Sequence, residues 1–124
     1  MKAIRNESFI SEKQLEFVEG KDQPRKLTFE WYAKNVVNFP DKGVDYLGIK
    51  KRFDLLDKIV KQKDNEKILL EDSEWEFLKQ LGQQTSWVVI EMAIYRFQML
   101  IENAETVEVA EAKADPKPQN KKNQ

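Results

Sequence analysis

Apolar residues between positions 27 and 104 recur at intervals of three or four, the spacing that places side chains on one face of an α-helix. Polar breaks, glycine and proline divide this region into segments with that spacing. The predicted helices span residues 29–38, 45–62, 73–82 and 87–104. Thr28 and Asp45 are predicted to cap the first two, because their side-chain oxygens can accept hydrogen bonds from the first turn. Thr85 or Ser86 is predicted to cap the last helix.

β-Structure is predicted only as a minor element. Residues 14–19 alternate imperfectly between polar and apolar side chains and precede a turn signal at Gly20, so a short strand is predicted there. Ile4 or residues 9–10 would supply its partner strand. Residues 67–70 form an apolar run too short for a helix, which indicates a buried strand or an extended linker. The predicted fold class is therefore mainly α: a small bundle of about four helices, with short β-elements near the N-terminus and around residues 67–70.

The composition changes sharply near Ala104. From Glu105 to Gln124 the chain has no aromatic residue and no leucine, isoleucine or methionine. Such a segment cannot bury enough apolar surface to offset the entropy of ordering, so residues 105–124 are predicted to form a disordered tail that can be deleted with little loss of stability. Residues 1–104 are predicted to form a single helical domain, in which residues 1–26 are irregular or form short strands.

The second and last predicted helices supply most of the expected core. In the second helix the candidates are Tyr46, Ile49, Phe53, Leu56 and Val60, at three-four spacing. In the last helix they are Trp87, Ile90, Ala93, Ile94, Phe97, Leu100 and Ile101. Phe53 and Phe97 are the largest side chains at the centres of these faces, so each is expected to be buried.

The last predicted helix also carries a second apolar stripe. It consists of Val88, Met92, Tyr95 and Met99, on a different side from the core face. A helix that is apolar on two sides is either central in its bundle or shared with a partner. Methionine and tyrosine are common in protein interfaces, so these four residues are the candidate interface for self-association.

Charge and residue usage narrow the function. The chain has 124 residues, of which 35% are charged, and a formal net charge of −1, so no overall attraction to nucleic acid is expected. It contains no cysteine and no histidine, which excludes Cys/His zinc sites and mechanisms that need a thiolate or an imidazole. No apolar run approaches the roughly 20 residues of a membrane helix, and residues 1–7 do not resemble a signal peptide. We expect a cytosolic, non-enzymatic protein with no membrane association, no cofactor and no metal.

An acidic cluster is the strongest candidate for paired carboxylates or a metal site. It contains Glu71, Asp72, Glu74 and Glu76. All four lie in or beside the first turn of a predicted helix, where carboxylates interact favourably with the positive end of the helix dipole. Helix capping is the favoured interpretation, with Asp72 or Ser73 as the cap and Ser73 and Glu76 as a capping box.

The densest basic cluster is the candidate nucleic-acid site. It consists of Lys50, Lys51 and Arg52, with Lys34 or Lys42 nearby. Consecutive helical residues point about 100° apart, so only part of the cluster can form one patch. A solvated helix face is the favoured interpretation, and nucleic-acid binding is the alternative.

Residues 28–103 resemble small uncharacterised helical proteins of tailed bacteriophages and prophages. The shared motifs are Leu27-Thr28-Phe29, Asn38-Phe39-Pro40, residues 51–57, Leu70-Glu71-Asp72-x-Glu74, Trp87-x-x-x-Glu91 and Phe97-x-x-x-Ile101-Glu102. The resemblance implies a phage origin and a location in the cytoplasm of the bacterial host or in the virion. It transfers no catalytic residue.

These observations favour a non-enzymatic phage protein that acts through protein–protein contacts, in virion assembly or in modulation of a host protein. Its partner would be a second copy, another phage protein or a host protein. The alternative is a small nucleic-acid-binding regulator.

Overall fold

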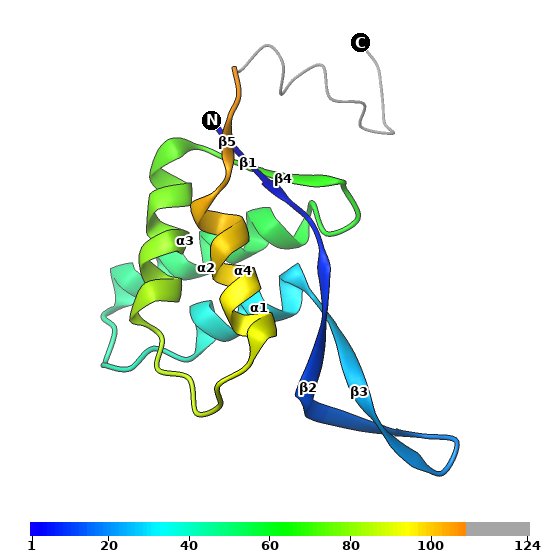
Figure 1. Ribbon diagram of the computed structural model, residues 1–124. Helices are drawn as coiled ribbons and strands as arrows, with labels where there is room; N and C mark the ends of the chain where they lie inside the picture. The colour runs from blue at the N-terminus through cyan, green and yellow to red at the C-terminus, as the bar shows by residue number, and fades with distance from the viewer. Residues whose placement is uncertain (109–124) are drawn as a thin grey trace.

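The computed structural model describes residues 1–108, which form four helices and five strands (Figure 1). Their order is β1 (Lys2–Arg5), β2 (Ser8–Val18), β3 (Lys21–Thr28), α1 (Phe29–Asn38), α2 (Tyr46–Val60), β4 (Lys67–Leu70), α3 (Asp72–Gln84), α4 (Met92–Glu102) and β5 (Glu105–Thr106). The prediction of a mainly α bundle is therefore wrong, because the described residues form a mixed fold with two antiparallel sheets.

One sheet joins three segments that are distant in sequence. Its order is β4-β1-β5, with Ala3 opposite both Leu69 and Glu105. The predicted strand at residues 67–70 is confirmed. The sheet itself leaves little trace in the sequence, because short strands paired over such separations show no periodicity of their own.

The second sheet is a long hairpin formed by β2 and β3. Its turn is Glu19-Gly20, where both residues have positive φ (51° and 79°), as expected for the tight turn that matches strand twist. Residues 14–18 of the predicted strand lie within β2 and Glu19 lies in the turn, but the partner strand is β3 and not Ile4 or residues 9–10. A bulge shifts the register between Ser11 and Leu15, and beyond it the hairpin leaves the helical body (Figure 1).

Local capping explains where the helices begin. The Trp31 N–H donates to Thr28 Oγ1 at 3.1 Å, and the Gly48 N–H donates to Asp45 Oδ1 at 2.8 Å, so both predicted caps are confirmed. The predicted Ser73–Glu76 capping box is wrong: Glu71 and Glu74 form it, and the Glu71 N–H donates to Glu74 Oε1 at 2.7 Å.

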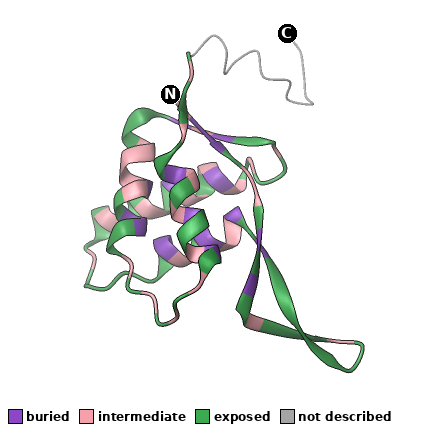
Figure 2. Cartoon of the chain, viewed as in Figure 1, coloured by how far each residue is buried: buried purple, intermediate pink, exposed green. Residues whose placement is uncertain are grey.

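The core lies where the helices meet the base of the hairpin and the three-stranded sheet (Figure 2). Its aromatic centre is built on Phe97, whose ring centroid lies 5.0 Å from that of Phe29 and 5.4 Å from that of Tyr32. Phe9 of β2 packs edge-on against Tyr32 at 5.5 Å. The hairpin base is therefore part of the same core as α1 and α4.

The buried face of α2 differs from the predicted one. Leu55 and Ile59 are 3% and 0% exposed, whereas Phe53 and Tyr46 are 59% and 74% exposed. Arg52 lies on the buried side, and its Nη1 donates to the carbonyl oxygens of Val36 (3.3 Å) and Val37 (2.8 Å) near the end of α1. Residues three and seven positions apart share a helix face, so Arg52, Leu55 and Ile59 lie together on the side of α2 that contacts α1.

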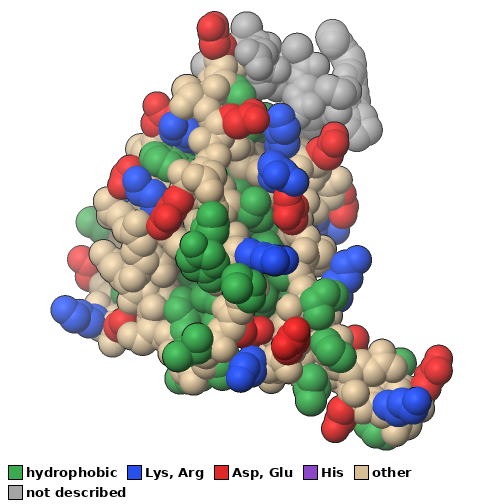
Figure 3. Space-filling model, in the orientation of Figure 1, with side chains coloured by type: hydrophobic (Ala, Val, Ile, Leu, Met, Phe, Trp, Pro, Cys, Tyr) green, Lys and Arg blue, Asp and Glu red, His purple; other side chains and the backbone are tan. Residues whose placement is uncertain are grey.

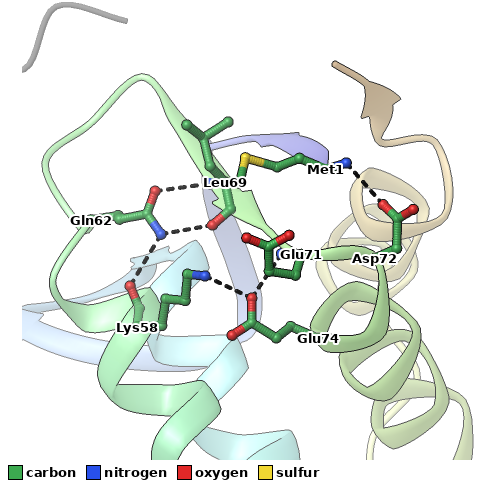
Figure 4. A network of polar contacts seen from close by, with 7 residues as sticks. All are labelled: Met1, Lys58, Gln62, Leu69, Glu71, Asp72 and Glu74. Carbon is green, nitrogen blue, oxygen red and sulfur yellow. Dashed lines mark hydrogen bonds and ion pairs between the residues drawn. The ribbon is translucent and has the colours of Figure 1, made fainter. Parts of the chain in front are cut away.

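The side chain of Gln62 connects the end of α2 to β4 (Figure 4). Its Nε2 donates to the Leu69 carbonyl oxygen at 2.9 Å, and its Oε1 accepts from the Leu69 N–H at 2.8 Å. In the same region Lys58 donates to Glu74 Oε1 at 2.8 Å, and the N-terminal amine pairs with Asp72 at 3.1 Å. These contacts hold α2, β4 and α3 together.

The C-terminal boundary of the ordered fold lies beyond the predicted one. Glu105 and Thr106 pair with β1 as β5, and the Val107 N–H donates to the Met1 carbonyl oxygen at 2.9 Å. The prediction that a disordered tail begins at residue 105 is therefore wrong for these positions. Residues 109–124, the rest of the predicted tail, lie outside the described residues.

Truncation after Ala104 is expected to lower the free energy of unfolding by about 1 kcal/mol relative to truncation after Glu108, because only the shorter chain loses the hydrogen bonds of β5. Urea denaturation of the two truncated proteins measures the difference. Equal denaturation midpoints would show that β5 contributes nothing to stability.

Candidate protein-interaction site

The outward face of α4 carries three of the four predicted interface residues. Met92, Tyr95 and Met99 are 61%, 60% and 38% exposed, and their three-four spacing places them along one line of the helix. The opposite face is buried through Ala93, Phe97 and Ile101. α4 is therefore apolar on both sides, although only one side faces the core.

The predictions for Val88 and Ile90 are wrong, because α4 begins later than predicted. The helix begins at Met92 and not at residue 87, so Val88 lies in the preceding segment and is 98% exposed. Ile90, predicted as core, is 94% exposed. β-Branched residues at 88–90 weaken helix formation, and tertiary contacts hold both ends of the segment.

Two hydrogen-bonding side chains provide those contacts. At the beginning of the segment, Ser86 Oγ donates to Asp41 Oδ2 at 2.8 Å. At its end, Ser11 Oγ donates to Glu91 Oε1 at 2.8 Å. Both Asp41 and Ser11 come from distant parts of the chain, so the sequence around α4 contains no sign of them.

A groove of about 720 Å³ runs beside the exposed face of α4. Met92, Tyr95, Met99 and Leu100 line it from the helix, and Ala3, Arg5 and Glu7 line it from β1 and the segment that follows. Arg96 and Glu105 also line it. The groove thus combines apolar side chains with charged groups of both signs.

A smaller hollow of about 270 Å³ adjoins this groove, because Met92 lines both. Ile10, which is 58% exposed on β2, and Ile90 line the smaller hollow. Figure 3 shows the resulting apolar surface running along α4 and on toward the base of the hairpin. We call these five side chains, Ile10, Ile90, Met92, Tyr95 and Met99, the α4 surface.

The sequence pattern identified only part of the α4 surface. Ile10 belongs to the α4 surface because β2 packs beside α4. The local sequence around Ile10 or around α4 does not indicate this long-range contact. Ile90 follows the apolar spacing of the last predicted helix, but this spacing predicted that it would be buried in the core.

A buried polar cluster lies behind the α4 surface. Ser11 is fully buried and bonded to Glu91, while the Tyr32 hydroxyl and Glu91 Oε2 have no hydrogen-bond partner among the described residues. Burial raises the pKa of Tyr32, the charge of Glu91 raises it further, and nearby Ser11 partly offsets both effects. Because Tyr32 and Ser11 are 0% exposed, the cluster supports the structure and offers no open catalytic site.

The raised pKa of Tyr32 predicts a loss of stability at alkaline pH. The phenol keeps its proton in both states well below pH 10; above its unfolded pKa of about 10 the unfolded chain loses that proton first. The native state then binds more protons, so the free energy of unfolding falls as pH rises toward the folded pKa. Tyr32→Phe is expected to remove this part of the pH dependence, measured as the difference between the two proteins' unfolding free energies from pH 8 to 11. A difference that is constant over this range would contradict the assignment.

The predicted basic cluster is dispersed in the structure. Lys50 pairs with Asp54 at 3.2 Å, and Lys51 Nζ lies 4.1 Å from the centre of the Phe77 ring. Arg52 binds the end of α1, as described above. Lys34 pairs with Glu30 at 2.9 Å. Lys42, in the α1–α2 connection, lines a hollow of about 500 Å³ together with Arg52. Lys50 and Lys51 do not line this hollow, so the basic residues do not form one patch.

The predicted acidic cluster contributes to capping and ion pairs. Besides the contacts of Glu71, Asp72 and Glu74, Lys79 pairs with Glu76 at 3.2 Å. Within residues 1–108, no group of three or more acidic side chains is arranged to hold a metal ion. None of the helices in this part of the chain has the length and hydrophobicity needed to span a bilayer.

Comparison of the chain with protein-family models, with curated proteins and with solved structures found no match.

Proposed function

We propose that this protein is a non-enzymatic interaction module that binds a protein partner through the α4 surface. The observation that carries the proposal is the continuity of this surface, in which apolar side chains from β2, from α4 and from the segment before α4 line two adjoining hollows. Soluble proteins rarely leave such a patch uncovered unless it binds something. Methionine side chains suit this role because they adapt to irregular partner surfaces.

The other exposed apolar residues fit this role less well. Tyr46, Leu47, Ile49 and Phe53 are exposed on α2, and the ion pairs Lys50–Asp54 and Lys61–Asp57 lie on the same helix. We favour α4 as the binding site because its exposed side chains line a groove. The resemblance of residues 28–103 to phage proteins supports a role in a bacteriophage, in virion assembly or on a host protein, within the host cytoplasm or the virion.

A photo-crosslinking amino acid at position 95 is expected to capture a discrete protein in bacterial cells that express this chain. Tyr46 provides a matched control, because it is also an exposed tyrosine (74% against 60%) but lies on α2. The same substitution at position 46 is expected to give no discrete adduct, and mass spectrometry identifies any product.

The double variant Met92→Glu, Met99→Glu is expected to weaken capture at position 95 at least tenfold, because carboxylates would be desolvated in the contact. Both positions are partly exposed, so the variant is expected to remain folded by circular dichroism. No adduct at position 95, or equal adducts at positions 95 and 46, would overturn the proposal.

A further inference from the structure

The hairpin beyond the bulge forms an arm, which we define as residues 15–24. None of its residues is buried, and Figure 1 shows it extending away from the helical body. A two-stranded hairpin alone is marginally stable in water, and three strands or a packed face are normally needed. The arm therefore lacks, among residues 1–108, the packing that would stabilise it.

One face of the arm is apolar. Leu15 and Phe17 are 53% and 73% exposed, and because they are two residues apart on β2 they point to the same side. Pro24 lies directly opposite Leu15, and Asp22 lies opposite Phe17. The face thus presents two large apolar side chains, a proline and a carboxylate.

We propose that the arm of one copy of this chain lies in the α4 groove of a second copy, with Leu15 and Phe17 against Met92, Tyr95 and Met99. This inference rests on the proposed function and names the occupant of the α4 surface. Residues two apart on a strand are separated by about 7 Å, and Met92 and Met99 by about 10 Å along the helix, so both apolar side chains fit the apolar line of α4.

The charges of the arm and the groove are complementary. Arg96, which lines the groove, makes no ion pair with any residue in 1–108, and the same holds for Asp22 of the arm. Docking Phe17 into the groove would carry its cross-strand neighbour Asp22 to the groove that Arg96 lines. An ion pair there would specify the register of the contact.

The geometry favours exchange between copies. β2 begins beside the groove, since Glu7 lines it and Ile10 lines the adjoining hollow, and the bulge then directs the arm away (Figure 1). Reciprocal exchange across a two-fold axis fills both grooves and closes the assembly at two copies.

Disulfide trapping tests the contact, because the chain has no cysteine of its own. Phe17→Cys and Tyr95→Cys proteins, mixed under mild oxidation, are expected to form the mixed disulfide at least tenfold faster than Phe17→Cys mixed with Tyr46→Cys. Equal rates for the two mixtures would overturn the inference.

Charge exchange provides a second test by light scattering. Asp22→Arg and Arg96→Asp are each expected to weaken the dimer at least tenfold, and the double variant is expected to restore it. Phe17→Glu is expected to give a folded monomer, whereas Tyr46→Glu should remain dimeric. A monomeric wild type at high micromolar concentration overturns the arm exchange, as does a dimer that persists in Phe17→Glu. Capture of a different protein at position 95 also overturns it but leaves the proposed function intact.

Discussion

Replacing Phe97 by alanine is expected to lower the free energy of unfolding by about 3–5 kcal/mol, because a fully buried aromatic side chain loses both its transfer energy and its packing. Phe97 is 1% exposed, and its ring packs between those of Phe29 and Tyr32. A domain of this size has a total stability of roughly 5–15 kcal/mol, so the variant would be close to unfolding. Urea denaturation followed by circular dichroism measures the change.

Phe53→Ala is the matched control for this substitution. The sequence pattern assigned both phenylalanines to the core, but Phe53 is 59% exposed on α2. Its replacement is expected to change the unfolding free energy by less than about 1 kcal/mol. Similar losses for the two variants would mean that the structure has the wrong face of α2 turned inward.

Replacing Gln62 by leucine is expected to lower the free energy of unfolding by about 2 kcal/mol. The Gln62 amide satisfies both the N–H and the carbonyl oxygen of Leu69, as a neighbouring strand would (Figure 4). Leucine has a similar size but no polar group, so both backbone groups of this half-buried residue would lose their partners. The difference in denaturation midpoint from the wild type gives the effect.

Gln80→Leu controls for the general effect of this exchange on a helix. Gln80 is exposed on α3 and makes one side-chain hydrogen bond, to Glu76 at 3.2 Å. Its replacement is expected to change stability by no more than about 0.5 kcal/mol. An equal effect at positions 62 and 80 would show that the contact with β4 does not stabilise the fold.

The candidate site was partly predictable from the sequence. Met92, Tyr95 and Met99 could be grouped because residues three and four apart share a face within a single helix, whatever surrounds it. Ile10 could not be added, since its position beside α4 depends on how the hairpin base packs. Val88 was wrongly grouped with them, because the spacing continues into a segment that Asp41 and Ser11 hold out of the helix.

The sequence by itself determined the local features of the fold, which depend only on residues close together along the chain. Thr28 and Asp45 begin their helices through bonds to residues three positions away, so a local pattern was sufficient to predict them. The absence of cysteine and histidine likewise excluded whole classes of chemistry without any structure.

Only the tertiary structure decided the arrangement of the sheets and the orientation of α2. β1 lies between β4 and β5, and its partners are more than sixty residues away, as in the pair Lys2 and Leu70. The inward face of α2 carries Leu55 and Ile59, with Arg52 bonded to the carbonyl groups of α1, whereas Tyr46, Ile49 and Phe53 of the predicted face are exposed. Such contacts depend on which distant segments pack together in the folded chain. The local hydrophobic pattern does not specify this long-range packing.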